Sequence, residues 1–423
     1  MDIRNEMNHV FNIKLTKFIG LYQMLDPGSL KYRGRNVYHI SAACILLFMC
    51  LNSVLLNVSG LYYWTDNMSI SVDCFWKAEI LVYLVYKMWI VVHHSNDIWD
   101  CLSITRYDFT SFSLRNRHIL DRWRGRSVWL TTMCAILYSG FSAIYLGSTL
   151  AFRNNILPIK NHDGSVGFYR QNVMNLYLFV SDETYNANYN TFYIVEALYL
   201  AMMIISFIIF DIVLITLCIA LCCQMQMICS AFKSVGHKSL CDSHSSIDYT
   251  DEKNKKRNKL DLVYVELKTI IMDHQAVMEK YEHFLALFRR VMLLQIFISS
   301  FSVIALWFLF IMSFSSDDKF KDMDVELKKM ICPIIAILFE IYIVCYLFGH
   351  LHNQKDSIIF ALYSSNWTEM DLKCKKLILL TMKMNNANQK KLKFTRTKIV
   401  NLEMFYKIMG NCYTVVSILV NYV

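Results

Sequence analysis

The sequence predicts an all-α membrane protein that crosses the bilayer seven times. Of its 423 residues, 55% are hydrophobic and only 18% are charged, whereas soluble domains carry roughly 45–50% apolar and 25% charged residues. Only 12 glycines and 3 prolines occur, which excludes collagen-like and turn-rich all-β folds and favours long helices. The composition therefore indicates a polytopic helical bundle rather than a soluble domain.

Seven stretches are long and apolar enough to cross the hydrocarbon layer, which takes roughly 20 helical residues. The second is interrupted by Lys77, Glu79 and Lys87, and the last by Glu403 and Lys407. We expect the spans at residues 37–58, 73–92, 128–151, 191–221, 291–313, 331–349 and 401–421.

The distribution of lysine and arginine predicts the orientation of these helices. Residues 1–36 and the second, fourth and sixth connections hold 33 Lys and Arg, whereas the alternate connections hold 7. Because basic loops stay in the cytoplasm, we expect a cytoplasmic N-terminus and an extracellular C-terminus. The net charge of +9 is then a topology signal with attraction to anionic lipid, not a nucleic-acid-binding surface. This orientation also argues against a G-protein-coupled receptor.

No motif in the sequence predicts catalysis, a cofactor or a metal site. Patterns such as G-x-S-x-G, H-E-x-x-H and the Walker phosphate loop are missing. The 14 cysteines form no C-x-x-C pair and lie mostly in apolar runs, where a thiol packs as a small hydrophobe. His350 and His352 have no evident third ligand, so we expect interfacial histidines. We therefore expect neither an enzyme nor a bound cofactor.

The chain divides into three expected parts. Residues 1–349 hold helices one to six, the bundle that would bind a ligand, with a flexible polar loop in the cytoplasm at 236–262. Amphipathic basic segments at 350–400 predict cytoplasmic anchor helices for subunit assembly, and 401–423 form the last helix. The largest external connection, 152–190, is either a folded lid over an outer opening or a flexible loop.

The last helix carries a polar face. Polar groups that face lipid are unfavourable, so this face meets water or other protein. On the residues alone, two interpretations stay open, namely hydrogen-bonded packing against another helix or the wall of a pore. The residues of this face recur at steps of three or four and are Glu403, Lys407, Asn411, Thr414, Ser417 or Ile418, and Asn421.

A series of short motifs occupies residues 357–420. Ala361-Leu362-Tyr363 precedes Trp367, a Lys-Lys-Leu-Ile-Leu-Leu-Thr-Met stretch occupies 375–382, and Tyr413-Thr414 follows in the last helix. This order resembles the C-terminal signature of insect odorant receptors, although Thr414 stands where the family has serine and Asn385-Asn386 where a proline is expected. The order Tyr-Thr without a later Gln-Phe differs from gustatory receptors, and the loop before the fifth span is short for the odorant co-receptor.

The resemblance implies an odorant-tuning subunit of a heteromeric, ligand-gated, non-selective cation channel in the plasma membrane of olfactory sensory neurons. Its implied partners are odorant co-receptor subunits in a tetramer, membrane lipid and a small, volatile, hydrophobic odorant. A gustatory-type receptor channel or a non-channel seven-helix chemoreceptor is the alternative. Because the family's final helices line a central pore, the pore interpretation of the last helix leads, with Thr414, Ile418, Asn421 and Tyr422 at the pore and gate.

The resemblance also implies an odorant site between helices two, three, four and six, in the outer half of the membrane. Such a site needs concave aromatic walls with few polar groups, although any single aromatic residue is more often part of the core or of the lipid belt. The candidates are Phe75, Trp76, Tyr83, Tyr86, Tyr138, Phe141, Ser142, Tyr145, Tyr193, Ala197, Tyr199, Met203, Ile334 and Ile335.

Four ionisable side chains within the spans have open roles. Lys77 follows Asp73 by four residues, the spacing of a helical ion pair, and Glu196, Asp211 and Glu340 are candidates for pairing across helices. Each is either functional or satisfied within the bundle. Outside the spans, the sequon at Asn67 falls in an external loop, where we expect glycosylation.

Overall fold

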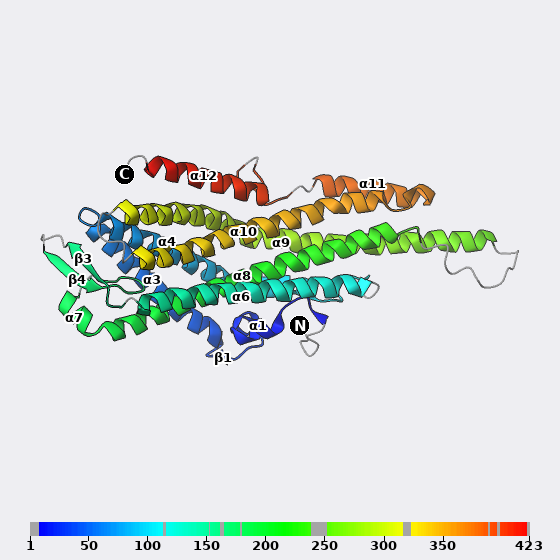
Figure 1. Cartoon of the computed structure of the whole chain (residues 1–423). Helices are drawn as coiled ribbons and strands as arrows, with labels where there is room; N and C mark the ends of the chain where they lie inside the picture. The colour runs from blue at the N-terminus through cyan, green and yellow to red at the C-terminus, as the bar shows by residue number, and fades with distance from the viewer. Residues whose placement is uncertain are drawn as a thin grey trace.

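The computed structural model describes residues 8–112, 116–151, 153–160, 165–177, 180–237, 252–315, 323–387, 390–395 and 398–420. Long helices run lengthwise in one elongated bundle (Figure 1). The antiparallel hairpin of β3 (Ile156–Lys160) and β4 (Val166–Arg170) lies at one end of the bundle, and α11 (Leu372–Ala387) lies towards the other. The expected helical membrane fold is confirmed.

The first six expected spans fall within long helices, in the expected order, and α12 accounts for residues 402–420 of the seventh. These helices are α3 (Val37–Tyr63), α4 (Met68–His93), α6 (Arg117–Ala151), α8 (Tyr189–Ser234), α9 (Glu252–Ser315), α10 (Met323–Tyr363) and α12 (Leu402–Val420). Short elements connect them, namely α1 (Ile13–Phe18), α2 (Leu21–Leu25), β1 (Lys31–Tyr32), β2 (Arg35–Asn36), α5 (Ser95–Cys101), α7 (Asp182–Ala187) and the 3₁₀ turns Leu102–Thr105 and Trp367–Glu369.

Among the described residues, α3, α6, α8, α9 and α10 are long and apolar enough to cross a membrane by themselves. α4 is interrupted by charged residues, of which Lys77 and Lys87 are buried. With 46, 64 and 41 residues, α8, α9 and α10 are much longer than a span requires. They therefore continue beyond the bilayer, and the expected boundary at residue 349 lies inside α10.

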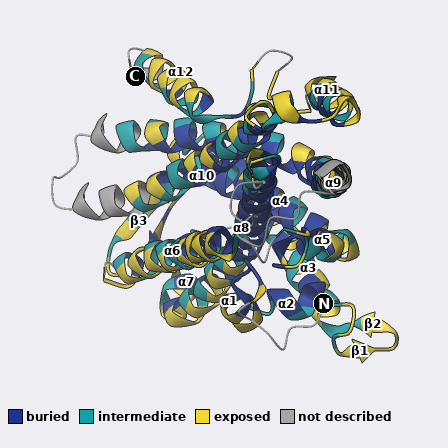
Figure 2. Cartoon of the chain, turned by 90° about the vertical axis from the view of Figure 1, so that its right-hand side faces the viewer, coloured by how far each residue is buried: buried dark blue, intermediate teal, exposed yellow. Residues whose placement is uncertain are grey.

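α8 is the central helix of the bundle. In its most apolar stretch 83% of the residues are buried, against 28% in α3 and 33% in α6. A helix that is apolar on all sides belongs in the interior, whereas a helix with one exposed apolar side faces lipid. Figure 2 accordingly shows buried residues concentrated around α8 and exposed ones on α6, α11 and α12.

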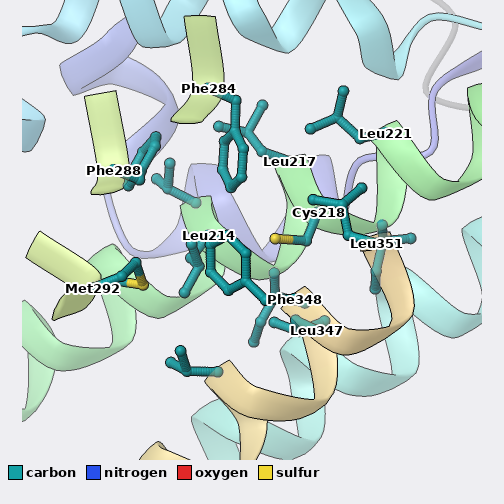
Figure 3. Packing of buried hydrophobic residues seen from close by; sticks show 14 of the residues in the cluster. Leu214, Leu217, Cys218, Leu221, Phe284, Phe288, Met292, Leu347, Phe348 and Leu351 are labelled. Atoms are coloured by element: carbon teal, nitrogen blue, oxygen red, sulfur yellow. The ribbon is translucent and has the colours of Figure 1, made fainter. Parts of the chain in front are cut away.

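A packed aromatic core joins α8, α9 and α10 (Figure 3). Phe284 lies between Phe288 and Phe348, with ring centroids 5.1 Å and 5.9 Å away. Leu214 and Cys218 of α8 face these rings. Burying each phenylalanine stabilises the bundle by about 1.5–3 kcal/mol, so this core fixes the three longest helices to one another.

The C-terminal helices lie outside this core. α11 contacts α9 and α10, and α12 lies along the same two helices on the surface of the bundle (Figure 1). Met404 and Cys412 are the buried side chains on the described part of α12. The rest of its surface is therefore left for contacts with something other than this chain's own bundle.

Candidate functional site

A cavity of about 120 Å³ lies between α4, α6, α8 and α10. We call it the interhelical cavity. Concave, mostly apolar walls with few polar groups are what a small hydrophobic ligand requires. The lining residues are Trp76, Lys77 and Ile80 of α4, Tyr138, Phe141, Ser142 and Tyr145 of α6, Met174 of the segment between β4 and α7, Leu200, Met203, Ile204 and Phe207 of α8, and Cys332, Pro333, Ala336, Ile337 and Glu340 of α10.

The structure brings together six of the fourteen candidate ligand residues around this cavity. They come mostly from α6, whose inward side recurs at 138, 141, 142 and 145, one helical face. The six are Trp76, Tyr138, Phe141, Ser142, Tyr145 and Met203.

The other eight candidates do not line the cavity. Phe75 packs on Trp64 at 6.0 Å between ring centroids. Tyr86 stacks on Trp89 at 6.1 Å. Tyr83 belongs to the charge cluster described below, and the Tyr193 hydroxyl donates to the Leu146 carbonyl. Tyr199 packs beside Phe48. Of the last three, Ala197 is half-buried, Ile334 is buried and Ile335 is exposed.

On α10 the residues that line the cavity are not the expected Ile334 and Ile335 but their neighbours on an adjacent face of the helix. Pro333, Ala336, Ile337 and Glu340 follow at i, i+3, i+4 and i+7, which places them on one side of the helix. A charged residue in a span faces the interior. Glu340 therefore identifies this side in the sequence, and counting back from it would have found Ala336, Ile337 and Pro333.

A buried charge cluster forms the floor of the cavity. Lys87 Nζ lies 2.6 Å from Glu340 Oε1 and 3.4 Å from Asp211 Oδ1. The Tyr138 hydroxyl donates to Asp211 at 2.8 Å, and the Tyr83 hydroxyl donates to Glu340 at 3.3 Å. The cluster joins α4, α6, α8 and α10, and it explains how α4 tolerates a lysine in the middle of the bundle.

A second ion pair borders the cavity at Lys77, away from the charge cluster. Lys77 Nζ contacts Asp73 Oδ2 at 2.6 Å, as the i, i+4 spacing predicted. The indole of Trp76 donates to the other Asp73 oxygen at 3.0 Å. Lys77 also donates to the Met174 carbonyl at 3.4 Å, so this pair connects α4 to the segment between β4 and α7.

Segment 171–177, between β4 and α7, covers the cavity, and Met174 belongs to its lining. Buried Glu196 of α8 accepts the Met174 N–H at 2.6 Å. The Tyr145 hydroxyl donates to the Val173 carbonyl at 3.1 Å. Asn175 adopts a left-handed φ of 60°, which asparagine tolerates better than most residues. Glu196 thus binds backbone amide rather than a cation.

A tyrosine cluster supports this segment from the side of the hairpin. Tyr177 lies 4.8 Å from Tyr169 and 5.2 Å from Tyr185 between ring centroids. Burial raises the pKa of both Tyr177 and Tyr185, so their hydroxyls stay protonated and able to donate. A Cβ at Gly167 would lie 2.7 Å from the Tyr169 ring, so the hairpin needs glycine there. In the described residues, the connection is therefore a folded lid.

The expected pore face of α12 points away from this chain's own bundle. Glu403, Lys407, Asn411, Thr414 and Ile418 are all exposed. The Thr414 hydroxyl donates to the Gly410 carbonyl at 2.9 Å within the helix, and Lys407 pairs with Glu403 at 2.5 Å. The expected gate residues Asn421 and Tyr422 lie outside the described residues.

Two other expectations concern surface sites. The Asn67 side chain donates to the Lys160 carbonyl at 2.6 Å, next to the hairpin, and its glycosylation stays a prediction. Of the expected flexible loop at 236–262, residues 238–251 lie outside the described residues, whereas residues 252–262 are helical and form the start of α9.

Comparisons with known proteins agree with this architecture. The family model described as "7tm Odorant receptor" matches residues 74–413. The structure is similar to that of the insect olfactory receptor OR5 from Machilis hrabei, with a TM-score of 0.69 at 14% identity over 96% of this chain and 97% of that one. For the same receptor in complex with eugenol, the TM-score is 0.71 at 13% identity over 97% and 98%. No curated protein matches by sequence.

The family match spans most of the chain, including the helices that form the cavity and most of the last helix. The structural similarity, at such low identity, shows the shared fold. Receptors of this family are not enzymes, in keeping with the sequence. The chain therefore belongs to the odorant receptor family.

Proposed function

We propose that this receptor is the odorant-tuning subunit of a heteromeric, ligand-gated, non-selective cation channel. The observation that carries the proposal is the interhelical cavity, an apolar space between four helices with a lid above and a charge cluster below. Such a site suits a small hydrophobic odorant that makes one or two polar contacts. The complex of a receptor of the same fold with eugenol, a small aromatic molecule, supports this ligand class.

The proposed ligand residues are those of the fourteen candidates that line the cavity, together with two residues that the sequence did not offer as ligands. Phe141 and Met203 supply apolar wall, and the Ser142 hydroxyl supplies a polar contact. Met174 closes the site from the lid, and Glu340 borders it from the floor.

A continuous set of contacts connects this site to the last helix. The Ser299 hydroxyl of α9 donates to Glu340 Oε2 at 3.3 Å. One residue on, the Ser300 carbonyl accepts from the Cys412 thiol of α12 at 3.8 Å. An odorant that moves α10 at Glu340 would therefore shift α9 and then α12. We propose that this movement opens a pore lined by Thr414 and Ile418, with Asn421 and Tyr422 at the gate.

The partner would be the odorant co-receptor, in a tetramer. Apolar side chains that this chain leaves exposed near α11 support assembly through that region. Leu372, Leu379 and Met384 of α11 are 62%, 55% and 64% exposed, and Phe360 of α10 is 71% exposed. The excess of lysine and arginine in alternate connections supports a cytoplasmic position for this end of the bundle. Membership of the odorant receptor family supports a location in the plasma membrane of olfactory sensory neurons.

Expression with and without an insect odorant co-receptor tests the proposal. Odorant-evoked cation current that requires both chains is expected. Current from this chain alone would contradict the heteromeric channel, and a response through cytoplasmic partners without current would favour a non-channel receptor. A tag after Val423 should label on intact cells and a tag before Met1 should not, and the reverse would contradict the orientation.

A further inference from the structure

A second cavity lies where the β1–β2 hairpin meets the start of α3, beside the bundle and away from the lid (Figure 1). It measures about 730 Å³ and opens to the surface between α2, the hairpin, α3 and the start of α5. We call it the hairpin groove. Its rim and its floor differ in chemistry, and both are needed to infer what it holds.

The rim of the groove is basic. Lys31 and Arg35 of the hairpin and His39 of α3 line it. The side chains of Lys31 and Arg35 are exposed, and Arg33 at the hairpin turn stacks over the ring of Tyr32 at 5.6 Å. Asp26 is the acidic residue of the lining, and its carboxylate already accepts the Gly28 N–H at 2.9 Å.

The hairpin that carries these cations is fixed in place. Arg33 and Gly34 have φ angles of 50° and 80°, the left-handed pair of a tight two-residue turn. Asn36 caps α3 by accepting the Tyr38 N–H at 2.9 Å, and its amide donates to the Gln23 carbonyl at 3.1 Å. The basic side chains therefore start from a rigid backbone beside the N-terminus of a membrane helix, whose dipole also favours an anion.

The floor of the groove is an apolar stripe that continues along α3. Ile40, Ala43, Cys44 and Leu47 line it at i, i+3, i+4 and i+7, which is one helical face. All four are exposed, Leu47 by 65%. From Ile40 to Leu47 the stripe rises about 10 Å along the helix axis, in the direction of the bilayer centre.

We propose that the hairpin groove binds one anionic phospholipid of the cytoplasmic leaflet. The phosphate lies between Lys31 and Arg35, and one acyl chain lies along Ala43, Cys44 and Leu47. Charge complementarity selects this occupant, because basic side chains at the inner membrane surface attract anionic headgroups and an exposed apolar face inside the bilayer meets lipid tails. The inference rests on the proposed cytoplasmic position of the N-terminus.

Native mass spectrometry of the purified full-length chain tests this, with phosphatidylserine or phosphatidylcholine added to delipidated protein. Tighter binding of phosphatidylserine is expected, and K31Q/R35Q should weaken it at least about tenfold. K375Q/K376Q on α11 removes the same charge elsewhere and should leave it unchanged. Ala43→Trp fills the floor without changing charge and should also lower retention.

Equal retention of the two lipids by the unaltered chain would overturn the proposal. Equal retention of phosphatidylserine by K31Q/R35Q and the unaltered chain would overturn it too. Displacement of the lipid by millimolar glycerol phosphate would also overturn it, because the groove would then bind a phosphate without needing the chain. None of these measurements involves an odorant or a current, so their failure would leave the proposed channel function standing.

Discussion

Lys87 of α4 and Glu340 of α10 form an ion pair in the interior of the bundle, with 2.6 Å between Nζ and Oε1. Their side chains are 0% and 4% exposed. The attraction within a buried pair is largely offset by the loss of hydration, but removing one partner strands an uncompensated charge. Because Glu340 also lines the interhelical cavity, the same pair holds the helices together and forms the floor of the site.

Lys87→Met is expected to destabilise the receptor strongly, by about 3–5 kcal/mol, because it strands both Asp211 and Glu340. Glu340→Gln should cost less, since Lys87 keeps Asp211 as a partner. Lys390→Met, which breaks an exposed pair with Glu282, should cost about 1 kcal/mol or less. Thermal unfolding of the detergent-solubilised protein measures the loss of stability in each variant. Equal losses of stability for Lys87→Met and Lys390→Met would contradict this prediction.

Phe141→Ala on α6 and Phe75→Ala on α4 remove the same ring, and only Phe141 lines the cavity. At about 25 cal/mol per Å² of lost apolar contact, Phe141→Ala should move the odorant dose–response by about tenfold or more. Phe75→Ala should move it little, and ion selectivity should stay unchanged in both. Dose–response curves in cells with the co-receptor provide the measurement, and a larger shift for Phe75→Ala would place the ligand elsewhere.

Glu196→Gln should loosen the lid. The carboxylate accepts the Met174 N–H at 2.6 Å, and hydrogen bonds to charged groups contribute about 1.5–3 kcal/mol. We expect faster deactivation after odorant removal, because segment 171–177 opens more often. Glu183→Gln, on the exposed face of α7, is the matched control. Unchanged deactivation in Glu196→Gln would show that the lid does not limit ligand release.

The fold was predictable because its signals are local. Apolar runs of about 20 residues depend on the membrane rather than on tertiary contacts. The β3–β4 hairpin was not predicted, because it pairs only ten residues in a connection of mixed composition. Its stability comes from the tyrosine cluster, which forms only when α7 and α8 are in place.

The site was predictable in part, since a helix face can be read from spacing but its rotation depends on neighbours. The inward face of α6 was found through its recurring aromatic residues. On α10, the predicted Ile334 and Ile335 do not line the cavity, whereas Ala336 and Ile337 do. The pairing of Lys87 with Asp211 and Glu340 could not be predicted from local spacing, because the paired residues lie more than 100 positions apart in the sequence.

Ser299→Ala separates binding from its transmission to the last helix. It removes the hydrogen bond to Glu340 Oε2 without touching the cavity lining, so maximal current should fall while the half-maximal odorant concentration changes little. Ser302→Ala is the control, because Ser302 is buried on the same helix and its hydroxyl has no hydrogen-bond partner in the described structure. A similar fall in both variants would indicate damage to α9 rather than a lost connection.

Ile418→Ala and Ile408→Ala distinguish the two sides of the last helix. Ile418 is 51% exposed on the face that points away from the bundle, whereas Ile408 packs against the core. A hydrophobic constriction closes a pore by excluding water, so Ile418→Ala should raise basal current or alter permeability while ligand preference is kept. Ile408→Ala should instead lower the amount of folded receptor. Current and surface expression, measured together, decide between these outcomes. A change of ligand preference in Ile418→Ala without any change in permeation would contradict the proposal that α12 lines the pore.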